Sequence, residues 1–116
     1  MPEVMASPSE IRPYDGAVHD ELLSRAVIVY VWGSHGQPWP SRHPDAVKDR
    51  FGGEAAELLP RVEGIEREMH QDPRQWFAAD EATTGGRVSQ ALRSRHPELT
   101  DEAIEALAAQ FTYSYR

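Results

Sequence analysis

The stretch AVIVYVW, residues 26–32, decides the fold of this chain, because no other segment is as hydrophobic. The 116 residues have a mean hydropathy of -0.61, so a hydrophobic core has to form around this run. On periodicity alone, a short apolar run fits a buried strand and a buried helix equally well. The residues before the run, and the presence or absence of a partner strand, therefore decide between the two.

The residues before the run favour a helix. Asp20 and Glu21 would lie at the positive end of a helix dipole, and Gly33 is free to adopt the backbone conformation that ends a helix. The apolar residues that would share one face of this helix are Leu22, Leu23, Ala26 and Tyr30. We predict one helix over about residues 18–33, apolar nearly all round in its second half and buried in the middle of a bundle.

The alternative is an α+β fold in which residues 26–32 form a strand. That strand would need a partner, because isolated strands leave their backbone groups unpaired. The only other candidate is FTYSY, residues 111–115, which is a weak strand pattern. We therefore expect an all-α fold and keep a small two-stranded pairing of 26–32 with 111–115 as the alternative.

Capping residues and apolar periodicity predict four more helices. They are a short helix capped by Asp45 and stopped by Gly52, a longer helix from Glu54 to about His70 with a kink or break at Pro60, a helix that starts after Thr83 or Thr84 and ends at Arg95, and a last helix after Thr100 as N-cap. We expect a single helical domain over 18–116, a bundle of about five helices around the central one. Residues 1–17, rich in proline and serine, are expected to form an extended or disordered lead-in.

Composition and charge narrow the range of partners and locations that the protein can have. The net charge of -7 disfavours nucleic acid as a partner and is compatible with a basic protein partner. No cysteine is present, no signal peptide is recognisable and no apolar run approaches the ~20 residues of a membrane span. We expect a small acidic protein of the cytoplasm.

No catalytic constellation stands out. Ser34 lies in WGSHG, which lacks the first glycine of a nucleophile elbow, and no phosphate-binding loop or cofactor motif is present. We therefore expect no catalysis and no cofactor. A weak alternative is an N/O metal site made by His35, His43, Asp45 and His70, although their spacing matches no compact ligand pattern.

The proline-rich segment GSHGQPWPSRHP, residues 33–44, is the most distinctive part of the sequence. Prolines on both sides of Trp39 restrict its backbone, and a partly exposed indole is typical of an interface anchor. We expect Trp39, Arg42, His43 and His35 to bind a protein partner, as in an inhibitor, an immunity-type protein or an accessory subunit. The alternative is a small-ligand or metal-binding protein that uses this loop. Trp32, Trp76 and Phe77 are expected to pack on the core.

Overall fold

The computed structural model describes residues 19–115, so the lead-in predicted for 1–17 lies outside the described residues. The elements are α1 (Glu21–Trp32), α2 (Pro44–Phe51), the 3-10 helix η1 (Gly52–Glu54), α3 (Ala55–Gln71), the 3-10 helix η2 (Pro73–Trp76), α4 (Glu81–Arg95) and α5 (Asp101–Ser114). No strand occurs within residues 19–115, which confirms the all-α fold. The alternative pairing is wrong, because both of its segments are helical apart from the final residue, Tyr115.

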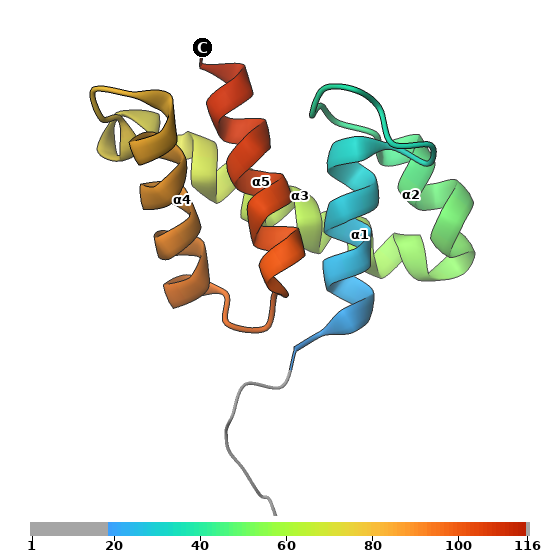
Figure 1. The fold of residues 1–116 in the computed structure, drawn as a ribbon. Helices are drawn as coiled ribbons and strands as arrows, with labels where there is room; N and C mark the ends of the chain where they lie inside the picture. The colour runs from blue at the N-terminus through green and yellow to red at the C-terminus, as the bar shows by residue number, and fades with distance from the viewer. Residues whose placement is uncertain (1–18, 116) are drawn as a thin grey trace, which may run out of the picture.

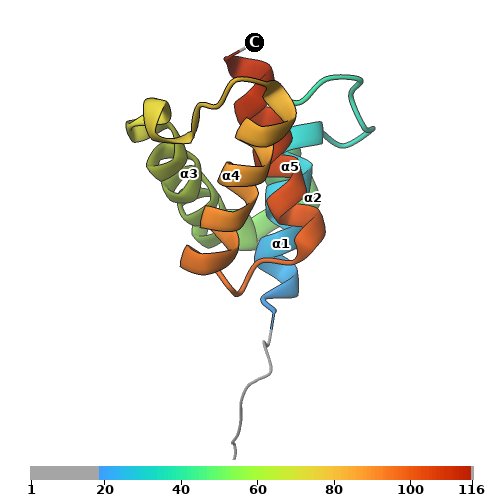
Figure 2. The same cartoon turned by 60° about the vertical axis from the view of Figure 1, so that its left-hand side comes forward.

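The helices form two layers (Figure 1). α1, α5 and α4 lie side by side with α5 in the middle, and α3 crosses behind them (Figure 1; Figure 2). α2 packs beside α1 and leads into α3. The first helix was predicted to occupy the buried centre of the bundle, and in the structure α1 shares that position with α5. α1 is buried along most of its length, and α5 separates it from α4.

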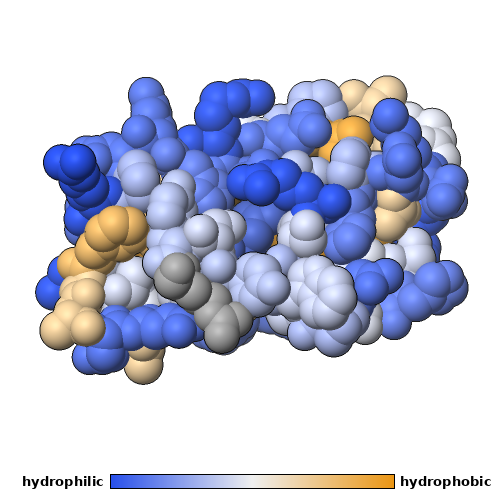
Figure 3. All heavy atoms as spheres, turned by 90° about the horizontal axis from the view of Figure 1, so that it is seen from above, coloured by the Kyte–Doolittle hydropathy of each residue, from blue (hydrophilic) through white to orange (hydrophobic). Residues whose placement is uncertain are grey.

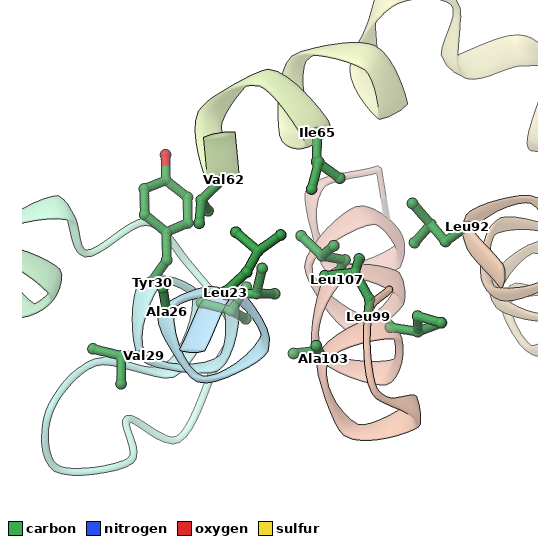
Figure 4. Packing of buried hydrophobic residues seen from close by; sticks show 14 of the residues in the cluster. Leu23, Ala26, Val29, Tyr30, Val62, Ile65, Leu92, Leu99, Ala103 and Leu107 are labelled. Carbon is green, nitrogen blue, oxygen red and sulfur yellow. The ribbon is translucent and has the colours of Figure 1, made fainter. Parts of the chain in front are cut away.

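The core lies where α3 crosses α1 and α5. Figure 4 shows Leu23 of α1 and Leu107 of α5 facing each other beneath Val62 and Ile65 of α3. Eight residues of the described core are 0% exposed, among them Val27, Val62, Leu107 and Phe111. Burying a side chain of this size contributes about 1.5–3 kcal/mol. The apolar run of α1 therefore stabilises the fold by packing against α5, α3 and α2.

Thr100 caps the last helix as predicted, whereas Asp20, which the prediction places inside the first turn of the first helix, is the N-cap of α1. The side chain of Asp20 accepts a hydrogen bond from the Leu23 amide at 3.0 Å, so α1 begins at Glu21 rather than near residue 18. The hydroxyl of Thr100 accepts from the Ala103 amide at 3.3 Å, as predicted for the last helix. Each cap satisfies a backbone donor that a helix start leaves unpaired.

Two other helix starts differ from the prediction. α2 has Pro44 at its first position, with Asp45 inside the first turn instead of at the cap. α4 begins at Glu81 rather than after Thr83 or Thr84. The reason is that the Asp80 carboxylate accepts hydrogen bonds from the amide of Thr83 at 2.7 Å and from its hydroxyl at 3.0 Å. This cap moves the threonine and glycine pairs into the first two turns of the helix.

Of the two outcomes predicted at Pro60, a kink or a break, the break is wrong. α3 continues from Ala55 to Gln71 with Pro60 inside it. The proline ring is exposed, while Leu58 and Val62 on either side are buried. Packing of those neighbours offsets the backbone hydrogen bond that proline cannot donate. No helix within residues 19–115 has the length and apolar character needed to cross a membrane.

The aromatic residues near the core follow the prediction in part. Trp32 and Trp76 are half-buried against the core, and the indole N–H of Trp76 donates to the Met69 carbonyl at 3.2 Å. Phe77 does not form a buried plug, because 43% of it is exposed. It lies where the chain turns from η2 into α4, and it contacts other rings at the C-terminal end of α5.

Candidate functional site

Residues 33–43, which we call the Trp39 loop, fold back over the C-terminal end of α1. The last four carbonyls of a helix lack partners within the helix. Here the carbonyls of residues 29–32 accept hydrogen bonds from the amides of Gly33, His43, Ser41 and Gln37, respectively, at 2.7–2.9 Å. Gly33 and Gly36 adopt positive φ values of 80° and 64°, which lets the chain turn twice in this short distance. The loop is therefore part of the helix end rather than a loose connection.

A buried carboxylate holds the loop to α3. Glu66 is only 8% exposed, and its Oε1 accepts a hydrogen bond of 3.0 Å from the Tyr30 hydroxyl. Its Oε2 forms an ion pair with Nε of Arg42, whose side chain is half-exposed. In Figure 4 the Tyr30 ring rises from α1 on the side where α3 crosses. Glu66 thus joins α1, α3 and the Trp39 loop, and burial together with its negative charge raises the pKa of Tyr30.

A second tether links the loop to α5. Gln110 is 1% exposed, and its side-chain amide donates to the Ser41 carbonyl at 2.8 Å. The His43 ring lies close to the backbone of Gly33, so that a Cβ at Gly33 would approach it to 3.5 Å. These contacts fix residues 41–43 from three directions.

Trp39 remains at the surface of this fixed loop. It is 52% exposed, the most exposed large hydrophobic residue in the described part of the chain. His35 is also exposed, whereas His43 is half-buried and Arg42 faces Glu66. The structure therefore separates the four predicted partner-binding residues into two that are free to meet a partner and two whose contacts hold the loop.

An aromatic cluster lies at the same end of the molecule as the Trp39 loop (Figure 1). It consists of His70, Phe77, Phe111 and Tyr115, with ring centroids 4.8–6.1 Å apart. Phe111 is buried, and Tyr115 is 42% exposed. We call the end of the molecule formed by the Trp39 loop, the turn from η2 into α4 and the last turn of α5 the end face; Trp39, Phe77, Tyr113 and Tyr115 belong to these segments. Figure 3 looks down on it and shows a mostly polar surface with one group of apolar residues at the side where α4 begins and another at the opposite side.

A polar cavity of about 340 Å³ opens beside the Arg42–Glu66 pair. Its walls are Tyr30, Arg42, Glu63, Glu66, Arg67 and His70. The cavity brings together groups that can donate hydrogen bonds, accept them and carry either charge, and convergent polar groups fix the orientation of the ligand in small-molecule sites. Its volume is at the lower end of the range for such sites, about 300–1,000 Å³.

The residues of the predicted metal site do not converge. Among residues 19–115, no group of three histidine or acidic side chains is placed to hold a metal ion. Asp45 is exposed at the start of α2, and His70 lies on α3 within the aromatic cluster. His70 Nδ1 instead shares a 3.0 Å hydrogen bond with the Tyr115 hydroxyl.

The titration of His70 makes the free energy of unfolding depend on pH in a predictable direction. Burial lowers its pKa below the usual value, and the charge of Arg42 adds to this, while Glu66 and Gln110 act in the opposite direction. Above a pH of about 6.5 the His70 ring is neutral in both the folded and the unfolded chain. Its contribution to the stability of the fold is then fully present. As the pH falls below 6.5, the unfolded chain takes up a proton that the folded chain resists, and stability is lost.

We therefore expect the free energy of unfolding to fall more steeply between pH 7 and pH 5 for the wild type than for His70→Gln. Urea denaturation at several pH values measures this, and the other histidines are common to both proteins. Glutamine can still bond to Tyr115, so the comparison isolates the titration. Parallel pH profiles would contradict the assignment to His70.

Neither of the two tethers, Glu66 with Arg42 and Gln110 with Ser41, is directly predictable from the sequence. Glu66 lies four residues after Val62 and three before Met69, which places it on the buried face of α3. This spacing was the one feature of the sequence that could have indicated a buried carboxylate. Gln110 likewise lies on the buried face of α5. Their partners, Arg42 and Ser41, are 24 and 69 residues away in the chain.

Comparison with protein-family models, with curated proteins and with solved structures gives no match.

Proposed function

We propose that this protein binds another protein through its end face, with Trp39 as the anchor. The observation that carries the proposal is a tryptophan that is 52% exposed on a loop whose backbone completes the end of α1. Tryptophan is enriched among the residues that dominate binding energy in protein interfaces. A backbone that is already fixed loses little freedom on binding, so more of the contact energy becomes affinity.

The surroundings of Trp39 support the same function. The other exposed large hydrophobic residues among those described, Phe77, Tyr113 and Tyr115, belong to segments at this same end of the molecule (Figure 1). Exposed apolar groups concentrated on one surface are typical of interaction sites. The net charge of -7 favours a basic partner. The protein would act without catalysis, as an inhibitor, an immunity-type protein or an accessory subunit in the cytoplasm.

The test compares wild type, Trp39→Ala and Gln37→Ala in capture from a lysate of the source cells. Gln37→Ala is the matched control, because Gln37 is an exposed residue of the same loop and keeps its backbone amide. A captured protein is then purified and titrated by calorimetry. We expect Trp39→Ala to weaken binding by about tenfold or more and Gln37→Ala to leave it nearly unchanged.

Equal affinities of wild type and Trp39→Ala would contradict the proposal. Capture of no protein by either wild type or the control would favour a second function, binding of a small polar ligand in the cavity beside Arg42 and Glu66. The observation that supports this alternative is the mixture of opposite charges around about 340 Å³ of space. A ligand screen by thermal shift, repeated with Arg67→Gln, would then test it.

A further inference from the structure

A second cavity opens on the end face, between the start of α4 and the C-terminal end of α5. It has a volume of about 280 Å³ and is lined by residues 77–81 together with Thr84, Thr112 and Tyr115. This is enough room for one long side chain but little more. The cavity adjoins the aromatic cluster, since Phe77 and Tyr115 belong to both.

Two aromatic rings form walls of the cavity. Phe77 is 43% exposed and Tyr115 is 42% exposed, and their centroids are 5.6 Å apart with the rings edge to face. The face of an aromatic ring carries a negative partial charge that attracts a cation. Half-exposed rings around a cavity therefore favour a positively charged group with an apolar stem.

The charged groups that line this cavity are all negative. Asp80 and Glu81 are its ionisable carboxylates, and the lining includes no basic residue. Hydrogen bonds from the amide and hydroxyl of Thr83 hold the pKa of Asp80 below its usual value, so this carboxylate stays charged at neutral pH. Arg87 is near, but its Nη1 already donates to the Phe77 carbonyl at 2.7 Å.

The threonine hydroxyl groups that line the cavity already form hydrogen bonds within the protein. The Thr84 hydroxyl donates to the Asp80 carbonyl at 3.0 Å and accepts from the Ala78 amide at 2.9 Å. The Thr112 hydroxyl donates to the Ala109 carbonyl at 3.2 Å. The amides of Thr83 and Thr84, in the first turn of α4, both donate to Asp80. These hydroxyl groups are therefore not free to bind an anion, whereas carboxylate oxygens and aromatic surface can bind a cation.

We infer that this cavity receives an arginine side chain of the protein partner, next to the surface that Trp39 anchors. The inference rests on the proposed function for the identity of the partner. A guanidinium group can form two parallel hydrogen bonds with a carboxylate while its plane stacks on an aromatic ring, and a lysine ammonium matches this site less well. Charge complementarity with an acidic chain of net charge -7 points to the same occupant.

The test uses amide NMR of the full chain titrated with N-acetyl-arginine amide, and N-acetyl-citrulline amide as the neutral probe of the same shape. We expect the arginine probe to shift the amides of residues 77–84 and 112–115 with saturation in the millimolar range. The citrulline probe should produce no saturating shift. N-acetyl-lysine amide should bind more weakly than the arginine probe.

Two double variants separate the site from the overall charge. Asp80→Asn with Glu81→Gln removes the carboxylates of the cavity, and asparagine at position 80 keeps a good helix cap. Asp101→Asn with Glu102→Gln removes the same charge at the start of α5. We expect the first to weaken arginine binding by about tenfold and the second to change it less than twofold.

Arginine binding that survives in the first double variant, equal shifts with citrulline, or no shifts in the cavity would each overturn the inference. These results do not depend on the Trp39→Ala experiment, because the probe is not the partner. Loss of partner binding in Trp39→Ala with no arginine binding would uphold the function and reject this subsite. The opposite pair of results would uphold the subsite and reject Trp39 as the anchor.

Discussion

Replacing Phe111 by alanine is expected to lower the free energy of unfolding by about 3–5 kcal/mol. Phe111 is 0% exposed and lies against His70 and Tyr115, with ring centroids 5.4 and 4.8 Å away. Its removal leaves a cavity between α5 and α3 that the surrounding helices cannot fill completely. The dispersion contacts around it are lost as well as the transfer energy of the ring.

Urea denaturation followed by circular dichroism measures this loss. Phe77→Ala is the matched control, since Phe77 belongs to the same cluster but is 43% exposed. Its loss should stay below about 1–2 kcal/mol because water already reaches much of the ring. If Phe111→Ala fails to fold, Phe111→Leu is expected to lose roughly 1–1.5 kcal/mol. Similar losses at positions 77 and 111 would contradict the burial difference.

Replacing Glu66 by alanine is expected to cost about 1–3 kcal/mol and to loosen the Trp39 loop. The variant removes the acceptor of the buried Tyr30 hydroxyl, and an unpaired buried donor carries the full cost of its lost hydration. The Arg42 side chain is 52% exposed, so water can replace its lost partner. The larger penalty of a fully buried unpaired charge therefore does not apply.

Hydrogen exchange reports the loosening of the loop directly. The amides of Ser41 and His43 donate to carbonyls of α1, and both should exchange faster in Glu66→Ala relative to global unfolding. Glu63→Ala is the matched control, because Glu63 lines the same cavity but its side chain makes no hydrogen bond or ion pair within the described part of the chain. Exchange at Ser41 and His43 that is unchanged in Glu66→Ala would show that the backbone bonds alone fix the loop.

The helices were predictable from the sequence because their signals are local. Asp20 and Thr100 accept hydrogen bonds from amides three residues away, and an apolar period identifies the buried face of α3 and α5. The start of α4 was harder, since Asp80 and the threonines that follow are all good caps. The tertiary structure decides between such candidates.

The candidate site was predictable only in part for the same reason. Proline and glycine around Trp39 predict an exposed ring on a restricted loop, and the structure places the ring at the surface. The tethers depend on chain segments far apart in sequence, as in the bond between Gln110 and Ser41. No local pattern distinguishes an arginine that meets a partner from one that pairs with Glu66. The continuity of α3 through Pro60 likewise depends on its packing against other helices.

The match between the Trp39 loop and the carbonyls of α1 limits how this segment can be engineered. Gln37, Ser41 and His43 each meet a particular carbonyl, so one added residue between them would shift the later donors away from their acceptors. Substitutions at the exposed positions 35, 38 and 39 leave these bonds in place. A library that varies those positions at constant loop length would keep the backbone and change its recognition surface. The domain could thus serve as a scaffold for selecting new binders.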